Sequence, residues 1–296
     1  MSEPRPRLFL VDGNSFVFRA FFGVPPRSTS SGLPTNAILG FTNMMVDLLR
    51  RHRPEYIAVV LDAGKENFRH RLFAGYKSQR PKLPADLIPQ LPYLRSVLDA
   101  LGLPAVELAD YEADDVIASL CKAFADPERR ITVVSTDKDL MQLVGDGVDL
   151  LDAARGRWID ALAVRRKFGV APAQVIEVMG LMGDAVDNIP GVRGIGAKTA
   201  AALIQKFHSL ENLFERLEEI DALELRGAAR LRRLLTDGRE SAFLSRALAT
   251  VKSDLALRVE LDDLRARGFS LEKLRALCTK LEFFNLLAIF GRERAA

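Results

Sequence analysis

Residues 183–200 contain an acidic pair followed by a glycine-rich turn, in the sequence Gly-Asp-Ala-Val-Asp-Asn-Ile-Pro-Gly-Val-Arg-Gly-Ile-Gly-Ala-Lys-Thr-Ala. Asp184 and Asp187 are three residues apart, so on a helical turn both carboxylates project from one face and can share a hard divalent cation. From Gly191 onward, glycines form a tight turn before the Ala-rich segment 197–207, which leaves backbone N–H groups at a helix start free for an anion. The stretch therefore predicts a metal-binding half and a phosphate-binding half.

The glycines also allow a plainer interpretation, in which they only separate two packed helices, because glycines are common in turns. A Walker P-loop is excluded. Gly191 and Gly196 have the glycine spacing of that loop, but Ala197 separates the last glycine from Lys198, and no β-type run precedes the motif.

The composition is that of an ordinary soluble globular protein, with 48% apolar and 27% charged residues. The length of 296 residues allows about two domains. Cys121 and Cys278 lie far apart in apolar segments, which indicates free thiols in a reducing compartment. The first residues do not resemble a signal peptide, and no apolar run reaches membrane-spanning length. We therefore expect a cytoplasmic monomer without a membrane partner.

Three short apolar runs of the sequence are each followed by acidic residues. The runs and the acids after them are Leu8–Val11 with Asp12, Tyr56–Leu61 with Asp62, and Ile131–Val134 with Asp137 and Asp139. Helical patterns, such as residues 35–51, alternate with the runs, which predicts an α/β fold with a parallel sheet. Because the carboxyl ends of parallel strands meet at one edge of a sheet, we expect these acids to converge.

A further acidic motif, Tyr-Glu-Ala-Asp-Asp at Tyr111–Asp115, opens the predicted helix Val116–Phe124. Capping and the helix dipole alone would explain acids in a first turn. The whole set of nine acids is harder to explain in this way: Asp12, Asp62, Glu112, Asp114, Asp115, Asp137, Asp139, Asp184 and Asp187. Their mutual repulsion would be costly unless cations neutralised it, and oxygen ligands without His or Cys favour Mg²⁺ or Mn²⁺. We expect two or more such ions and phosphodiester hydrolysis.

The net charge of +3 hides an excess of basic residues. Setting the nine acids aside leaves 30 acids against 42 bases, an excess of 12 positive charges over the rest of the chain. This excess suits a polyanionic partner such as a nucleic acid.

The segment Lys65–Lys82 is rich in basic and aromatic residues, with six Lys or Arg residues against a single acid. Bases for phosphates and aromatic rings for stacking are typical of a surface that binds an unpaired strand. The alternative is a solvated helix whose apolar stripe packs on the core. We expect Phe68 and Phe73 to lie in the core, and Tyr76 and Lys77 to contact the substrate.

Beyond Ala200 the apolar residues have helical spacing in four segments, which predicts a smaller all-α domain. The segments are Leu210–Leu217, Ala228–Leu235, Ser241–Val251 and Leu271–Phe284, with Gly227, Gly238, Gly268 and Gly291 as separators. We therefore expect an α/β core at residues 1–178 and a helical domain at residues 179–296.

Six motifs, in order along nearly the whole chain, resemble the 5′ nuclease superfamily, the flap-endonuclease-like 5′-3′ exonuclease domains of bacterial DNA polymerase I. They are Val-Asp-Gly-Asn at Asp12, Phe-Arg-His at Phe68, Tyr-Lys at Tyr76 with Arg80, Tyr-Glu-Ala-Asp-Asp at Tyr111, Asp-Lys-Asp at Asp137, and Gly-Asp-Ala-Val-Asp-Asn-Ile-Pro-Gly at Gly183. The resemblance implies a PIN-like parallel-sheet nuclease core with a helical arch at about residues 65–95, and a helical domain containing a helix–hairpin–helix. It also implies a structure-specific enzyme that hydrolyses 5′ flaps, nicked DNA and RNA primers in DNA replication and repair by two-metal catalysis.

The same resemblance implies roles for individual residues. It places Asp12, Asp62, Glu112 and Asp114 in a first metal cluster, Asp137, Asp139, Asp184 and Asp187 in a second, and Asp115 between them as a catalytic residue. It implies that Lys77 and Arg80 contact the scissile phosphate. The implied DNA contacts are Arg69, Tyr76 as a base-stacking residue, Gly191, Gly194, Ile195, Gly196 and Lys198. It further implies K⁺ held by carbonyls of the turn at residues 191–196, and a DNA polymerase, fused or separate, as a partner.

The sequence departs from the family pattern in small ways. Phe18 and Phe22 stand where relatives often carry Tyr and His, and Gly64 alters the usual order after Asp62, but no carboxylate is lost. Two other functions fit part of the pattern: a non-catalytic DNA-structure binder, and a compact PIN-type ribonuclease. The complete set of acids argues against the first function. The basic segment at residues 65–82 and the turn at Gly191 argue against the second.

Overall fold

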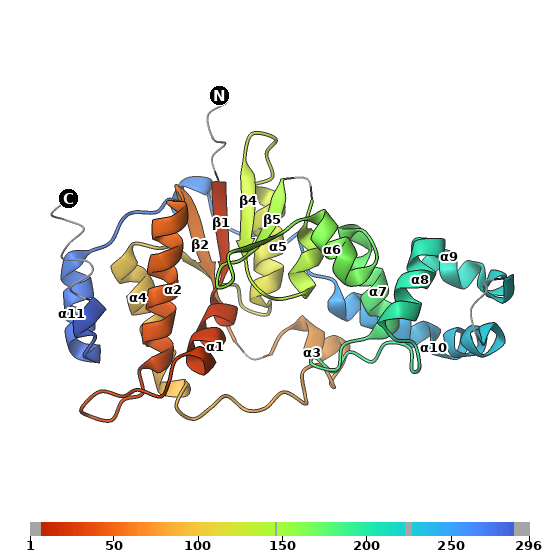
Figure 1. The fold of residues 1–296 in the computed structure, drawn as a ribbon, viewed down its shortest axis with the longest axis horizontal. Helices are drawn as coiled ribbons and strands as arrows, with labels where there is room; N and C mark the ends of the chain where they lie inside the picture. The colour runs from red at the N-terminus through yellow and green to blue at the C-terminus, as the bar shows by residue number, and fades with distance from the viewer. Residues whose placement is uncertain (1–6, 65, 146, 223–226, 287–296) are drawn as a thin grey trace.

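The structure is a computed structural model that describes residues 7–64, 66–145, 147–222 and 227–286 (Figure 1). Lys65, the first residue of the predicted basic segment, and Gly291, a predicted separator, lie outside the described residues. At the centre is a six-stranded sheet in the order β3-β2-β1-β4-β5-β6. The strands are β1 Arg7–Asp12, β2 Tyr56–Val60, β3 Ala105–Val106, β4 Arg130–Val134, β5 Val148–Asp152 and β6 Arg157–Ile159. All pairs are parallel except β5 with β6.

The predicted α/β fold is confirmed, and the strand order shows where a ligand site belongs. The order reverses direction between β1 and β4, and ligands of open parallel sheets bind beyond the carboxyl ends of strands at such a point. The three predicted strands are β1, β2 and β4. The sequence did not reveal β3, β5 and β6, because they are two, five and three residues long and two of them lie at the sheet edges.

Helices cover both faces of the sheet, because alternate strand residues point to opposite sides. Phe9 and Val11 pack into one core cluster with residues of α1, α2, α4 and α11. Leu8 and Leu10 pack into the other cluster, with α5, α7, α8 and α10. The helices on the first face are α1 Gly13–Gly23, α2 Asn36–His52, α4 Tyr93–Leu101 and α11 Leu271–Leu281.

The second face and the projection to one side of the molecule consist of the remaining helices (Figure 1). They are α5 Ala113–Ala123, α6 Ala161–Phe168, α7 Val175–Met182, α8 Ala197–Phe207, α9 Leu210–Glu215 and α10 Ala228–Ala249, with the short α3 Phe68–Leu72 beneath them. Short 3-10 helices lie at Ile88–Gln90, Asp139–Leu143, Pro172–Gln174, Leu217–Ala222 and Leu261–Leu264. Within the described ranges, no helix is long and apolar enough to cross a membrane.

One long helix replaces the two that the sequence predicts on either side of Gly238. A single α10 runs from Ala228 to Ala249 through this glycine. A Cβ atom at Gly238 would lie 2.6 Å from Cγ1 of Val192, so the glycine allows close packing of the turn before α8 and does not end a helix.

Helix α11 packs on the α/β core, although the sequence places it after the other C-terminal helices. Its residues Leu274 and Leu277 join the core cluster that contains Phe9 and Phe41, and Figure 1 shows α11 beside α4, at the end of the molecule away from α8 and α9. The sequence assigned this helix to the C-terminal domain, whereas the structure packs it on the α/β core. The boundary at residue 178 itself stays a prediction.

Candidate metal and phosphate site

The first two acids of the site lie at the carboxyl ends of neighbouring strands. Asp12 ends β1 and caps α1: its Oδ1 accepts from the N–H of Ser15 at 2.9 Å, and its Oδ2 accepts from Ser135 Oγ at 2.7 Å. Asp62 follows β2 and accepts from the N–H of Ala113 at 2.7 Å. These bonds fix both carboxylates at the carboxyl edge of the sheet.

The turn after β4 brings in two further acids. Asp137 accepts from the N–H of Asp139 at 2.9 Å, and the N–H of Asp137 donates to Ser135 Oγ at 3.0 Å. Glu112 and Asp114 come from the start of α5, where Glu112 is the N-cap residue. Acids from β1, β2, β4 and α5 therefore meet at one place, as the strand pattern predicts.

Asp184 and Asp187 lie in a tight turn and not on the helical turn that their spacing suggests. The turn is closed by backbone bonds in both directions between Asp184 and Ile189, of 2.9 and 2.7 Å. Asp184 also accepts from the N–H of Val186 at 2.9 Å. The turn still carries both carboxylates to the strand-end acids, because helix α7 ends at Met182 directly before it.

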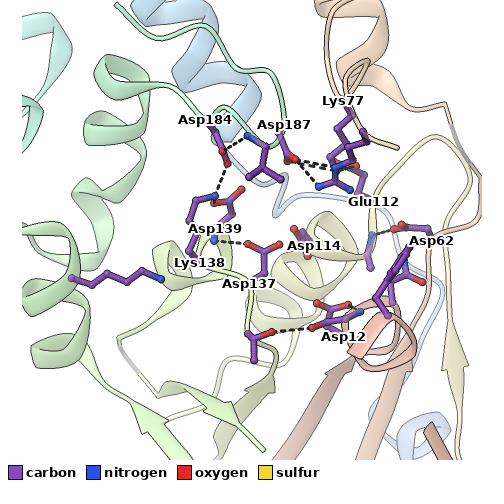
Figure 2. A pocket seen from close by; sticks show the side chains of 18 residues that line it. Asp12, Asp62, Lys77, Glu112, Asp114, Asp137, Lys138, Asp139, Asp184 and Asp187 are labelled. Carbon is purple, nitrogen blue, oxygen red and sulfur yellow. Dashed lines mark hydrogen bonds and ion pairs between the residues drawn. The ribbon is translucent and has the colours of Figure 1, made fainter. Parts of the chain in front are cut away.

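Eight of the nine predicted acids line one cavity of about 480 Å³. Figure 2 shows the labelled carboxylates around this shared space, with Asp184 and Asp187 at one end and Asp12 at the other. Oxygens of Asp139, Asp184 and Asp187 lie within 4.8 Å of one another, close enough to bind one metal ion together. The eight are Asp12, Asp62, Glu112, Asp114, Asp137, Asp139, Asp184 and Asp187.

Burial and mutual repulsion disfavour ionisation of several of these acids. Burial, with Asp137 and Asp62 nearby, raises the pKa of Asp12 to about 6. Burial and the neighbouring Asp137 likewise raise the pKa of Asp139 to about 6 and that of Asp114 well above its usual value. A bound cation would relieve this cost, since it favours the charged form of each acid.

Three basic side chains already offset part of the negative charge. The Lys138 ammonium lies 2.9 Å from Asp139 Oδ1 and also bonds Asp184. The Lys77 ammonium bonds Glu112 and lies 3.8 Å from Asp187 Oδ2. Arg80 Nη2 lies 2.5 Å from Asp187 Oδ1. Burial alone would raise the pKa of Glu112, but Lys77 and Arg69 outweigh burial and lower it.

With this geometry in place, the family of the chain can be read from two matches that together cover most of it. Residues 7–169 match the 5′-3′ exonuclease N-terminal resolvase-like domain, and residues 170–272 match the 5′-3′ exonuclease C-terminal SAM fold. The chain belongs to the 5′-3′ exonuclease family.

Individual relatives support this membership. The chain is 38% identical over 280 residues to a 5′-3′ exonuclease of Aquifex aeolicus, an alignment that covers 95% of this chain and 93% of the relative. It is 43% identical over 287 residues to DNA polymerase I of Pseudomonas aeruginosa, which covers 97% of this chain but 31% of the polymerase. This 5′-3′ exonuclease family member thus spans about a third of the DNA polymerase I relatives that it matches.

A solved structure has the same fold. The bacteriophage T5 flap endonuclease, in a complex with DNA and metal ions, is similar with a TM-score of 0.66 and 25% sequence identity. The match covers 83% of this chain and 89% of the phage chain. This family member therefore has the fold of a protein whose structure was solved with metal ions and DNA, and it carries an acidic cluster that could hold metal ions.

Asp115, the ninth acid, lies outside the cavity of this exonuclease family member. It is fully buried, and its two oxygens each bond the Arg69 guanidinium at 2.7 Å. Its Oδ1 also accepts from the N–H of Lys252 at 2.8 Å. The prediction that Asp115 lies between the two metal clusters is therefore corrected, because its carboxylate points into the protein interior and is already neutralised.

Arg69 is likewise not placed to contact DNA. Only 2% of its surface is exposed. Its guanidinium also donates to Glu112 and to the carbonyls of Leu248 and Thr250, at 2.8 to 3.0 Å. These bonds leave the side chain no free face for a phosphate.

Tyr76 of the basic segment does not have the role predicted for it. Tyr76 is 4% exposed and donates its hydroxyl to Glu112 at 2.8 Å, so its ring is part of the core and presents no face for base stacking. Phe68 and Phe73, which were predicted in the core, are half-buried, and Phe73 packs against the core cluster that contains Tyr76. The segment also has little helix, since α3 comprises five residues and turns follow it.

The remaining predicted DNA contacts lie in the turn before α8 and at the start of that helix, and some of them are buried while others are exposed. Gly191 and Ile195 are buried, and both backbone groups of Gly191 bond α10: its N–H donates to Ser245 Oγ at 2.8 Å and its carbonyl accepts from Ser241 Oγ at 2.6 Å. The Gly191 N–H is therefore not free to bind a phosphate. Gly194, Gly196 and Lys198 are exposed.

The cavity also contains residues that the sequence did not single out. Lys138 stands inside the quoted Asp-Lys-Asp motif, so its place between two acids was a usable signal. Lys167 of α6 lines the same cavity, and burial together with the nearby Lys138 lowers its pKa. Nothing in its local sequence marks it. Asn14, Ser15, Phe18, Ala113, Thr136 and Val186 complete the lining with Arg80 and the residues already named.

Proposed function

We propose that this chain is a structure-specific 5′-3′ exonuclease and flap endonuclease that hydrolyses phosphodiester bonds of 5′ flaps, nicked DNA and RNA primers. The observation that carries the proposal is one cavity lined by eight carboxylates and four basic side chains, in a member of the 5′-3′ exonuclease family. Carboxylates alone would repel a phosphodiester, so binding of this substrate requires cations between the carboxylates and the phosphate.

The cavity residues fit divalent metal ions. All the acidic donors are carboxylate oxygens, no His or Cys lines the cavity, and three of the oxygens already lie within a metal-binding distance of one another. This donor set suits Mg²⁺ or Mn²⁺. We assign one ion to Asp12, Asp62, Glu112 and Asp114, and another to Asp137, Asp139, Asp184 and Asp187. When bound, such ions would lower the pKa of a water molecule and offset the charge of the scissile phosphate.

The basic side chains at the cavity would hold the substrate. Lys77 and Arg80 belong to segment 75–80, and Lys77 is bonded at once to Glu112 and, through its backbone, to Asp187. Metal ions on those carboxylates would free the two cations to bind the scissile phosphate. Lys167, for which the described residues place no carboxylate within 4.0 Å of the ammonium, would bind a phosphate from the α6 side.

The duplex would bind away from the cavity, at the exposed part of the turn before α8. Gly194 and Gly196 expose backbone there, and Lys198 adds a cation in the first turn of α8. We also assign K⁺ to the carbonyls of this turn. A DNA polymerase, fused or separate, is the proposed protein partner, and the cytoplasm the proposed location.

The test is cleavage of a 5′-labelled flap duplex in Mg²⁺ and in EDTA, beside the matching blunt duplex and a single-stranded RNA. Metal-dependent cutting near the flap junction, with little cutting of the blunt duplex, is the expected result. Tight flap binding without cutting would instead indicate a non-catalytic binder, and preferred cutting of the RNA a PIN-type ribonuclease.

A further inference from the structure

Asn188 lies in the turn after α7 and does not line the cavity, yet its side-chain amide is fully engaged with a distant segment. Its Nδ2 donates to the carbonyl of Gly75 at 2.6 Å and to Ser78 Oγ at 3.2 Å, and its Oδ1 accepts from Gln79 Nε2 at 3.1 Å. Gly75 precedes Lys77 in the sequence, and Ser78 and Gln79 follow it. The amide of Asn188 therefore holds the turn that carries Lys77.

Contacts of Asp187 extend the same junction. The N–H of Lys77 donates to the Asp187 carbonyl at 2.9 Å, and Arg80 donates from Nε and Nη2 to Asp187 Oδ1 at 3.1 and 2.5 Å. We call the hydrogen bonds between residues 75–80 and residues 187–188 the clasp. The clasp joins the proposed phosphate-binding side chains to a proposed metal-ligand turn.

The backbone shows that the clasp imposes an unusual conformation. Lys77 and Asn188 both have a φ of 54°, in the left-handed region. Asn adopts this region readily, whereas Lys does so at a cost in free energy. Such a conformation persists where the surroundings hold it. Here the hydrogen bonds of Asn188 hold the chain on both sides of Lys77. In this conformation the Lys77 ammonium reaches Glu112 in the cavity.

We propose that Asn188 is a positioning residue, which fixes segment 75–80 on the metal-ligand turn and so sets where Lys77 and Arg80 meet the scissile phosphate. The inference rests on the proposed function of those two side chains. Displacing a substrate-positioning group by about 1 Å can cost roughly 10²-fold in rate. Within the clasp, Asn188 is neither a proposed metal ligand nor a proposed phosphate contact, so it can be changed without removing either.

Two substitutions remove the amide without straining the backbone. Asn188→Gly suits the left-handed φ and deletes the side chain. Asn188→Asp keeps the shape, but places an acceptor where Nδ2 donates to the Gly75 carbonyl. The matched control is Gln205→Ala, which deletes a comparable bond, from Gln205 Nε2 to the carbonyl of Gly169 at 2.6 Å, away from the cavity.

The first measurement is limited trypsin cleavage after Lys77, without DNA or metal. Both Asn188 variants should be cut there about fivefold faster than the wild type, because losing the bonds raises the population of open segment. The second is flap cleavage in Mg²⁺, where kcat should fall about 10- to 100-fold while KM changes less than about twofold. Gln205→Ala should match the wild type in both.

A double-mutant cycle separates positioning from general damage. If Asn188 acts through Lys77 and Arg80, then Asn188→Gly should slow single-turnover cleavage little further in a Lys77→Ala, Arg80→Ala background. Additive losses, or wild-type trypsin resistance and kcat in both Asn188 variants, would overturn the proposal. If the wild-type chain cuts no substrate, the proposed function fails, while faster trypsin cleavage would still establish the clasp.

Discussion

Asp114 illustrates how the site acids differ from acids that only cap a helix. It lies in the first turn of α5, where a carboxylate favours the helix dipole, yet burial and the nearby Asp137 and Asp12 raise its pKa well above the usual value. A residue selected for stability would not be placed where its ionised form is disfavoured. The placement is understandable if a cation supplies the missing stabilisation.

Asp114→Asn should therefore have opposite effects on activity and on metal-free stability. We expect flap cleavage to fall by at least about 10²-fold, since losing even an outer-shell partner of a metal costs about 10- to 100-fold. We expect the Tm in EDTA at pH 8 to rise, because the neutral amide removes the cost of ionisation. Single-turnover assays and thermal unfolding measure the two effects. Cleavage at the wild-type rate would remove Asp114 from the site.

The raised pKa of Asp12, about 6 against 3.8, makes a prediction about pH. Between about pH 4 and 6 the folded protein holds more protons on this group than the unfolded chain, so the free energy of unfolding falls as the pH rises through that window. The loss from this group is on the order of 2 kcal/mol. In EDTA, Asp12→Asn, which can still cap α1, should gain stability relative to wild type across this window. A stability difference that is independent of pH would contradict the assignment.

At the scale of elements, the buried Arg69 and Asp115 join three pieces of structure. Arg69 belongs to α3, Asp115 to α5, and the carbonyls of Leu248 and Thr250 to the end of α10. The sequence shows Arg69 in one motif and Asp115 in another. It does not show that they form a pair, because the number of residues between them does not determine their distance in the folded protein. Because both side chains are buried, we infer that Arg69 and Asp115 stabilise the fold.

Arg69→Met should destabilise the protein by about 3–5 kcal/mol, because it leaves Asp115 as an uncompensated buried charge. The matched control is Arg71→Met on the same helix, which breaks an exposed ion pair with Asp110 and should destabilise the protein much less than Arg69→Met does. Urea unfolding of both variants in EDTA measures the difference. Equal losses would mean that the Arg69 pair is not buried in solution.

Gly238 tests the close packing of α10 against the turn before α8. Ala normally stabilises a helix interior by about 1 kcal/mol relative to Gly. Here the added methyl group would lie 2.6 Å from Val192, so Gly238→Ala should instead destabilise the protein, by about 1–3 kcal/mol. Adding Val192→Ala should recover part of that loss. A stabilised Gly238→Ala protein would show that the two elements lie farther apart.

Across the whole molecule, the sequence predicts three of the six strands, β1, β2 and β4, and the convergence of eight carboxylates, because these strands are short apolar runs and the ends of parallel strands meet at one edge of a sheet. It does not predict which side chains of a motif face inward. Tyr76, Arg69 and Asp115 were expected at the substrate, but each is buried. Nor does it predict that α11 returns to the core, because that choice depends on which apolar surface remains uncovered once the other helices have packed.

Residues 191–198, at the turn before α8, do not line the cavity, so we expect that catalysis and duplex binding can be weakened independently. Lys77→Ala should lower kcat by about 10²-fold and change duplex affinity little, since its ammonium lies among the cavity carboxylates. Lys198→Ala should leave kcat at saturating DNA near wild type, but weaken binding and reduce the slope of log affinity against log salt by about 1. Cleavage kinetics and binding titrations at several salt concentrations, in Ca²⁺ to prevent cutting, would distinguish the two variants. Loss of duplex affinity in Lys77→Ala, with unchanged affinity in Lys198→Ala, would place the duplex over the cavity instead of on α8.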